Sequence, residues 1–463
     1  MTHFKQFALF ATLAHGAAAI AVEKRQIAGT ATVNLAQPSG APAHLASGII
    51  YGFPDNTDGT ANNDIPDDLV RGMGLNYCRA GGAQLPDGSL GWVAGQYEGR
   101  WLSTLSNYRT TRRYNGRFTL LMHDLWGADS LQGDGFHWPG DNGNWSLYDS
   151  FLDRVFSDIK ADDATEGLDI DIWNEPDLGS FWGASQDQYL ATWNRTYHRI
   201  RQDLPTIRIS GPSAAQPATS GSQWWQNYMA YIAQNNVIPD IYSWHILLTN
   251  RNLRESLGQF NLLRQRYSLP QREIVINEYA SWESDEQSPA GGAFYISQFE
   301  RHNIRGLRAN WGSASKLHDL LANLLVKNAN TGEYSTTGEW HVYNYYVREM
   351  KGQRVATTPS SDELFEVYAT RSSTLGSVKV LAAVRPTVGQ RTYHITITGL
   401  SAVGHTGDRV KIQTRRFDGP SVSTEVNGSA DLSVYEHEVV DDEVTFWVRP
   451  DVRTNAYAFE LVQ

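Results

Sequence analysis

Residues 168–176 read LDIDIWNEP, and residues 273–279 read EIVINEY. Each stretch is short and rich in Ile or Val, and each carries an Asn-Glu pair near its end, which is typical of a strand that gives way to a loop. The two glutamates, Glu175 and Glu278, are 103 positions apart (278 minus 175). The carboxyl ends of parallel strands meet on one face of a barrel, so these two side chains would converge there.

Further β-prone runs recur along the chain and alternate with amphipathic helical patterns. The strand candidates are residues 47–53, 77–83, 118–123, 168–173, 207–212, 241–246, 273–278 and 306–311. The helical patterns cover residues 147–159, 188–203, 223–235, 253–267, 291–302 and 340–350, with a further one at 316–327. Such alternation is the signature of βα units and predicts an α/β fold with a (β/α)₈ TIM barrel over residues 47–354.

The pattern changes at about Ala356, where short alternating runs separated by turn residues begin. The predicted strands there are residues 364–370, 377–384, 392–398, 410–415, 436–440, 443–448 and 456–462. We therefore predict a C-terminal antiparallel β-sandwich domain over residues 355–463. Residues 26–46 contain one more strand-like segment, 30–35, which we expect to cross over and complete this sandwich.

The first 25 residues are typical of a signal peptide followed by a short propeptide. Lys5 precedes an apolar stretch over residues 7–20, and Lys24-Arg25 forms a dibasic processing site. The stretch is too short and too interrupted for a membrane span, which needs about 20 apolar residues. We therefore predict a secreted, extracellular protein that does not bind the membrane.

The net charge and the modification motifs narrow the possible partners. The formal net charge of −11 argues against nucleic acid, whose phosphates require basic patches. Three glycosylation sequons begin at Asn144, Asn194 and Asn427, and with a signal peptide they indicate a glycoprotein. Cys78 is the single cysteine, so no internal disulfide can form.

The two strand-end glutamates match the needs of glycosidic bond hydrolysis with retention, in which one carboxylic acid protonates the leaving oxygen and one carboxylate attacks the anomeric carbon. We predict Glu175 as the acid/base and Glu278 as the nucleophile. The like charge of Glu278 would raise the pKa of Glu175. Arg79, near the end of its strand, would keep Glu278 ionised, whereas the deeper Asp169 and Asp171 are interpreted as structural and bonded to groups such as Arg79.

Other side chains near the strand ends are candidates for substrate binding. Asn174 would donate to a sugar hydroxyl, and His245 either bonds the nucleophile or a hydroxyl, or is an ordinary buried histidine. His123 and the indole rings of three tryptophans are predicted to contact sugar, although packing roles are equally open for the tryptophans. These three are Trp126, Trp282 and Trp311.

No nucleotide-binding loop, serine-hydrolase arrangement or zinc spacing is present, so we expect neither a metal nor another cofactor. The loop over residues 133–143 is acidic but lacks the ordered spacing of a calcium loop, and is interpreted as a solvated turn. Carbohydrate is the one expected partner, and nothing in the sequence indicates an oligomeric state.

Several motifs together resemble the clan of retaining glycosidases built on (β/α)₈ barrels. They are Arg79, Trp173-Asn174-Glu175-Pro176, Asn277-Glu278 and the trailing β domain. Ser210-Gly211-Pro212 and Ser243-Trp244-His245 make the chain most similar to the family-39 glycoside hydrolases. That family includes β-xylosidases, α-L-iduronidases and some arabinofuranosidases. One departure is Tyr279, because the xylosidase branch would have Phe after the nucleophile.

The resemblance implies a secreted retaining exo-glycosidase that acts on plant-type polysaccharides or oligosaccharides, most simply a β-xylosidase. An α-L-arabinofuranosidase or an endo-acting glycanase with the same mechanism is the alternative. A third hypothesis, from a different class, is a non-catalytic carbohydrate-binding protein on a barrel that has lost its activity. The presence of both carboxylates and their Asn neighbours argues against it.

Overall fold

Eight parallel strands close into a barrel in the computed structural model, which describes residues 27–83, 90–128, 132, 135–247, 252–280, 286–309, 319–388 and 390–462. The strands are β2 (Gly48–Ile50), β3 (Tyr77–Ala80), β4 (Arg117–Leu121), β5 (Leu168–Asp171), β6 (Arg208–Ala214), β7 (Ile241–Ile246), β8 (Glu273–Tyr279) and β9 (Arg305–Arg308). The predicted (β/α)₈ barrel is therefore confirmed, and all eight candidate strands contribute to it.

Several strands end earlier than their apolar pattern does. The pattern of β5 continues to Trp173, but pairing with its neighbours stops at Asp171. The prediction followed alternation, whereas the ladder ends where the backbone turns out of the sheet. Tyr51 shows the same effect after β2, because its φ of 55° is left-handed and incompatible with a continued strand.

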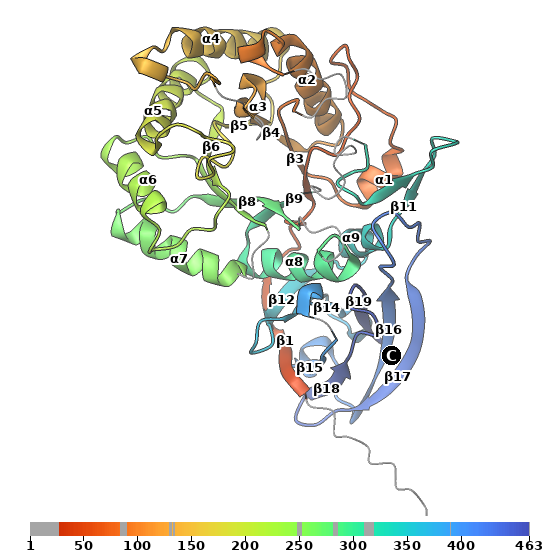
Figure 1. The fold of residues 1–463 in the computed structure, drawn as a ribbon. Coiled ribbons are helices and arrows are strands. Elements are labelled where there is room, and N and C mark those ends of the chain that lie inside the picture. Colours follow the sequence, from red (N-terminus) through yellow and green to blue (C-terminus); the bar gives the residue numbers. More distant parts are fainter. Residues whose placement is uncertain are drawn as a thin grey trace, which may run out of the picture.

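Helices surround the strands in a ring (Figure 1). They are α1 (Asp67–Gly72), α2 (Tyr97–Arg113), α3 (Met122–Trp126), α4 (Ser146–Ala161), α5 (Gln186–Asp203), α6 (Gln223–Gln234), α7 (Leu253–Arg266), α8 (Pro289–His302) and α9 (Gly338–Arg348). Among these described helices, none is long and apolar enough to cross a membrane.

The helices α1, α2 and α3 were not predicted, and one predicted helix is wrong. Helix α2 was missed because its buried face carries many polar side chains, such as Ser106, Asn107 and Thr111, and so shows no apolar stripe. The helix predicted over residues 316–327 is wrong over its described part, because residues 319–324 form turns and β10 (Leu325–Lys327) pairs with β11 (Tyr334–Thr336). Residues 316–318 of that prediction lie outside the described part of the chain.

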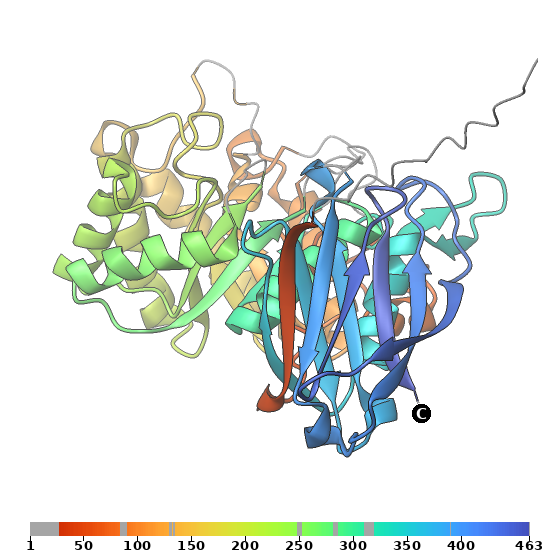
Figure 2. The same ribbon diagram turned by 90° about the horizontal axis from the view of Figure 1, so that it is seen from below.

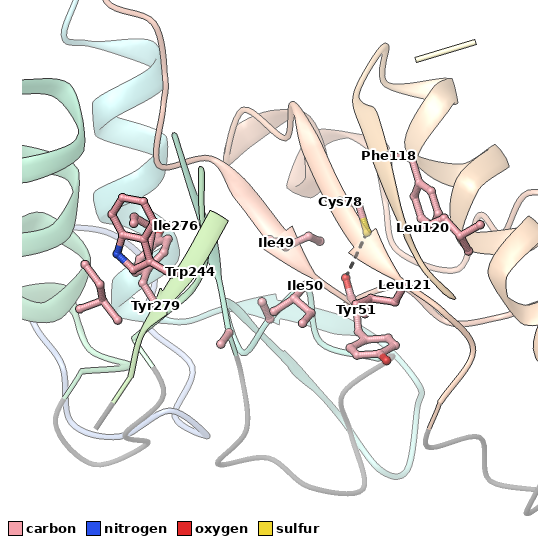
Figure 3. Packing of buried hydrophobic residues seen from close by; sticks show 14 of the residues in the cluster. Ile49, Ile50, Tyr51, Cys78, Phe118, Leu120, Leu121, Trp244, Ile276 and Tyr279 are labelled. Carbon is pink, nitrogen blue, oxygen red and sulfur yellow. Dashed lines mark hydrogen bonds between the residues drawn. The ribbon is translucent and has the colours of Figure 1, made fainter. Parts of the chain in front are cut away.

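The barrel strands pack their helix-facing side chains into one large apolar core. Figure 3 shows Ile49 of β2, Cys78 of β3 and Phe118 of β4 on adjacent strands. The Cys78 thiol lies 3.6 Å from the Tyr51 carbonyl oxygen and is fully buried, and burial raises its pKa to about 12. Cys78 is therefore a packing residue, not a reactive thiol.

The C-terminal part of the chain forms one nine-stranded sheet that β1 joins. Its strand order is β17 (Ala430–Glu438), β16 (Arg409–Phe417), β19 (Ala456–Val462), β14 (Lys379–Val384), β13 (Phe365–Arg371), β12 (Gln353–Thr358), β1 (Ile27–Gly40), β15 (Thr392–Thr398) and β18 (Glu443–Val448). The sheet is mixed and not wholly antiparallel, because β1 arrives from the N-terminal side and runs parallel to β15.

Alternation along these strands divides their side chains between two cores. On β13 and β14, Tyr368 and Leu381 join the core that the barrel helices share, and α8 lies against this side of the sheet (Figure 1). Residues of the opposite parity, such as Val367 and Val380, join a second core that also contains side chains of β1, β15 and β18. The sheet thus bends over into two layers, and one layer braces the barrel.

Candidate active site

The two glutamates singled out in the sequence meet at the carboxyl end of the barrel. Glu175 follows β5, Glu278 lies in β8, and His245 of β7 lies with them. One ligand-type atom from each of the three side chains lies within 4.8 Å of the others. The Glu175 side chain is 11% exposed and that of Glu278 is 2% exposed. Glu175 is therefore partly exposed to solvent, while Glu278 is buried.

The backbone at Glu175 is left-handed, with φ at 47°, and its N–H donates to the Ser213 carbonyl oxygen at 2.9 Å. A non-glycine residue in this region costs energy and persists only where surrounding contacts impose it. This turn ends the alternation of β5, so the position of Glu175 does not follow from counting by twos along the strand. The loop between β5 and α5 is anchored to β6 at this point.

Arg79, on β3, holds the site together from below. Its Nη1 lies 2.8 Å from Glu278 Oε1, its Nη2 lies 2.7 Å from Asp171 Oδ2, and Nη2 also donates to Asn174 Oδ1 at 2.7 Å. Burial acts to lower the pKa of Arg79, but Asp171 and Glu278 together keep it above its ordinary value. The guanidinium thus remains charged and stabilises the carboxylate form of Glu278.

Beneath this ion pair lies a buried hydroxyl and amide network that the sequence did not reveal. Ser213 Oγ donates to Asp171 Oδ2 at 2.6 Å and contacts Ser243 Oγ at 2.8 Å. The Asn277 amide nitrogen donates to Ser213 Oγ at 2.7 Å. Ser243 and Asn277 stand beside His245 and Glu278 in the sequence, which was the only signal for their role. The interpretation of Asp171 as a structural partner of Arg79 is confirmed.

Asp169 lies deeper in the barrel and is also structural. It forms ion pairs with Arg117 and with Arg208, and it accepts a hydrogen bond from the Tyr77 hydroxyl. Its side chain is fully buried. Of the two aspartates, Asp171 is therefore the one that pairs with Arg79, whereas Asp169 pairs with Arg117 and Arg208.

The Glu175 carboxyl has a raised pKa of about 7. Burial is the main cause, and the positive charges of Arg79 and His123 oppose it. The sequence-based expectation attributed the rise to the like charge of Glu278, so its direction agrees but its main cause differs. Burial also lowers the pKa of His245 to about 4, which leaves this imidazole neutral near pH 7.

Glu175, His245 and Glu278 are also the residue types that bind metal ions. The Arg79 guanidinium, however, lies 2.8 Å from Glu278 Oε1, so a fixed positive charge already occupies one side of this group. A divalent cation would be placed against that charge. These residues therefore fit an acid/base and nucleophile pair better than a metal centre.

His123 lies close enough to Glu175 for its charge to influence that carboxyl. Its Nε2 is 2.9 Å from Asp124 Oδ1, and the other Asp124 oxygen accepts a hydrogen bond from the Tyr51 hydroxyl. Sequence reasoning selected His123 but missed Asp124 and Tyr51, which orient it. The imidazole is 2% exposed, at the edge of the group.

An aromatic cluster lies beside His123. The ring centroids of Trp173 and Trp182 are 4.9 Å apart, Trp138 lies 5.3 Å from Trp182, and Phe181 lies 6.0 Å from His123. Trp138 and Phe181 are half-buried and so retain exposed ring surface. Phe181 was not singled out in the sequence.

The structure tests the predicted sugar contact for one of the three tryptophans. Trp126 is 1% exposed, its Nε1 donates to the His137 carbonyl oxygen, and it packs against Tyr148 and Phe151. This ring belongs to the core, so the predicted sugar contact is not supported. Trp282 and Trp311 lie outside the described residues.

Comparisons with known proteins agree with this geometry. A family model described as the glycosyl hydrolase catalytic core matches residues 160–303, which include both glutamates. A comparison with curated proteins finds no match. Among solved structures, N2152 from Neocallimastix frontalis is similar with a TM-score of 0.73 at 20% identity, over 95% of this chain and 100% of that one.

Two further structures share the fold. A GH39 enzyme from Xanthomonas axonopodis pv. citri has a TM-score of 0.58 at 14% identity, over 96% of this chain and 99% of that one. A monomeric β-xylosidase from Caulobacter crescentus has a TM-score of 0.57 at 13% identity, over 94% and 99%. The chain therefore contains a glycosyl hydrolase catalytic core on a fold like that of GH39 enzymes, and the predicted glycosidase is confirmed at this level.

Proposed function

We propose that the chain is a retaining, exo-acting glycoside hydrolase, most simply a β-xylosidase. The observation that carries this proposal is the separation of the two carboxyl groups, whose nearest atoms lie within 4.8 Å. Retaining glycosidases place their carboxyl groups about 5–5.5 Å apart, whereas inverting enzymes leave about 6.5–9.5 Å for a water molecule. This close approach of two carboxyl oxygens lies below the inverting range and favours direct attack.

The mechanism is a double displacement. Glu278 Oε attacks the anomeric carbon as the bond to the leaving oxygen breaks, and Glu175 gives its proton to that oxygen. In the second half, Glu175 takes a proton from water, the water oxygen attacks the anomeric carbon, and Glu278 leaves. The raised pKa of Glu175 suits both halves, because the group must hold a proton first and accept one later.

His245 couples the two carboxyl groups in the resting enzyme. Its Nδ1 lies 2.8 Å from Glu175 Oε1 and its Nε2 lies 3.5 Å from Glu278 Oε1. Neutral imidazole has one acceptor and one donor nitrogen. Protonated Glu175 donates to Nδ1, and the proton on Nε2 then faces the negative charge of Glu278. This arrangement holds the proton on Glu175 before substrate arrives.

Asn174 is the residue that we expect to recognise the glycone. Its carbonyl oxygen accepts from Arg79, and among the described residues its amide nitrogen has no hydrogen bond. That nitrogen is the group that would donate to a sugar hydroxyl next to the reacting carbon, where hydrogen bonds strengthen in the transition state.

The choice of xylose is supported by the resemblance to GH39 enzymes and by the fold shared with a β-xylosidase. Tyr279, the departure from the xylosidase pattern, does not face the site. Its side chain is fully buried, and its hydroxyl donates to the Ala46 carbonyl oxygen at 2.8 Å. The substitution is thus absorbed by packing, and it does not by itself favour another sugar.

The decisive experiment is hydrolysis of a panel of aryl glycosides, with the first product followed by proton NMR. We expect release from the β-xyloside, and β-xylose should appear before it mutarotates to the α form. Initial formation of α-xylose would contradict retention. Release from an α-L-arabinofuranoside alone would support the same mechanism with arabinofuranose as the glycone. Activity on xylan but on no aryl glycoside would indicate endo action.

The pH profile provides a separate prediction. The proposed acid must be protonated, and burial raises the pKa of Glu175 to about 7, so kcat/KM should stay high up to that pH and decline above it. The Glu175→Gln variant, assayed with a substrate whose leaving group needs no protonation, should lose this alkaline decline. An unchanged alkaline limb in that variant would assign the titration to another group.

We also propose that the chain is secreted and glycosylated, on the basis of the N-terminal segment and the sequons. Asn144 and Asn427 are exposed, whereas Asn194 is half-buried on α5 and the hydroxyl of its Thr196 contacts Tyr148 at 2.8 Å. Intact-mass measurement before and after enzymatic deglycosylation should show glycans at the two exposed asparagines. Secretion by a eukaryotic host without any mass change would contradict the glycosylation.

A further inference from the structure

The C-terminal sheet has a face that turns away from the second core, here called the outer face, formed by β12, β1, β15 and β18. Figure 2 shows β1 in red among the blue strands of this sheet. Alternate residues of these strands, such as Val33, Ile395 and Phe446, are buried in the second core. Their neighbours of opposite parity therefore form the outer face.

The outer face carries a row of hydroxyl groups across four strands. Cross-strand pairing aligns one threonine from each strand, and each of the four is exposed or half-buried. The row consists of Thr358, Thr32, Thr396 and Thr445. The last two hydroxyls lie 2.8 Å apart. Strands lie about 4.8 Å apart, so this row extends over about 14 Å.

A tryptophan stands beside this row. Trp447 is 62% exposed, and pairing places it next to His394 of β15, which in turn lies next to Thr30 of β1. Trp447 is the penultimate residue of β18, which is the last strand of the sheet, and its exposed indole ring offers an apolar face for stacking. A row of threonines can be explained by sheet stability alone, because cross-strand threonine pairs stabilise a sheet. Trp447 is therefore the residue that indicates a ligand.

The outer face carries little charge although the chain has a net charge of −11. A further cross-strand row lies on the other side of the threonine row, where Asn34 pairs with Thr398 and Thr398 pairs with Glu443. Glu443 is the single carboxylate among this row, the threonine row and the row that contains Trp447. A nearly neutral surface of hydroxyls with one exposed indole suits neither nucleic acid nor a charged protein partner. Its chemistry matches a neutral sugar chain, which offers hydroxyls for hydrogen bonds and an apolar ring face for stacking.

We propose that the outer face binds neutral plant-type polysaccharide, with Trp447 stacked on a sugar ring and the threonine row in contact with sugar hydroxyls. This inference rests on the proposed glycosidase function, because a polysaccharide is the substrate that such a platform would hold near the barrel. At β12 the outer face reaches the barrel, because Arg354 forms an ion pair with Glu300 of α8, whereas over β1, β15 and β18 its residues named above are exposed or half-buried. The platform would anchor the enzyme on insoluble material.

The test is depletion of the full chain from solution by insoluble xylan, measured in a Glu278→Ala background so that the xylan is not degraded. We expect Trp447→Ala to weaken the partition to xylan by about tenfold, the loss typical of one aromatic anchor. Trp447→Tyr, which keeps a ring, should retain most of the binding. Leu262→Ala is the matched control, because Leu262 is 54% exposed on α7, away from the outer face.

The outcomes separate this proposal from the proposed function. With Glu278 intact, Trp447→Ala should hydrolyse a soluble aryl glycoside at the wild-type rate, since the ring lies in another domain. Binding that depends on Trp447 in a chain without activity would leave the platform in place and overturn the glycosidase. Equal depletion of wild type and Trp447→Ala would overturn the platform. A wild-type dimer that Trp447→Ala converts to a monomer would also overturn the platform, because the outer face would then bind a second copy of the chain.

Discussion

Glu278→Ala should lower kcat/KM for an aryl β-xyloside by about 10⁴- to 10⁶-fold, the scale seen when a nucleophile is removed from an enzyme that forms a covalent intermediate. The carboxylate of Glu278 is 2% exposed and lies 2.8 Å from Arg79 Nη1. Without this carboxylate, the site lacks the nucleophile that attacks the anomeric carbon. The measurement is steady-state hydrolysis, together with mass spectrometry of enzyme trapped with a fluorinated xyloside.

Two further variants make this prediction specific. Glu278→Gln keeps the shape but not the charge, and an equal loss would show that the carboxylate itself is required. Glu273→Ala removes a carboxylate from the opposite end of the same strand, where it is 38% exposed and pairs with Arg208. This control should keep near wild-type activity. A Glu278→Ala enzyme that still forms the trapped adduct would assign the nucleophile elsewhere.

Glu175→Ala should produce a loss that depends on the leaving group. For xylobiose, whose leaving alcohol needs a proton, we expect a decrease in kcat/KM of about 10²- to 10⁴-fold, the usual contribution of a general acid. For an aryl xyloside with a strongly acidic phenol, the first step needs little proton transfer, so kcat/KM should fall much less. Plotting the logarithm of kcat/KM against the pKa of the leaving phenol measures this difference.

Azide provides the complementary test for Glu175. In the Glu175→Ala enzyme the covalent intermediate should accumulate, because no base remains to activate water. Azide needs no base, and it should restore turnover with formation of β-xylosyl azide. A uniform loss on all leaving groups without rescue by azide would indicate that Glu175 holds the site in shape and does not transfer protons.

Sequence periodicity was sufficient for the barrel because each βα unit is a local pattern. The run 241–246 matches β7 at both ends, and the runs 392–398, 443–448 and 456–462 match strands of the C-terminal sheet. Sequence periodicity failed where the buried side chains are polar, as in α2. It also failed where strand pairing, and not the hydrophobic pattern, decides the fold. The strand β12 was missed, and the parallel pairing of β1 with β15 has no local signal in either segment.

The side chains that could do the chemistry were identified without a structure, because a carboxylate at the end of an apolar strand is a local pattern. Tertiary structure decided how they act. Burial raises the pKa of Glu175, the left-handed turn at this residue sets its position, and His245 lies between the two carboxyl groups. These properties depend on solvent exclusion and on contacts between residues 70 to 199 positions apart, which no local pattern encodes.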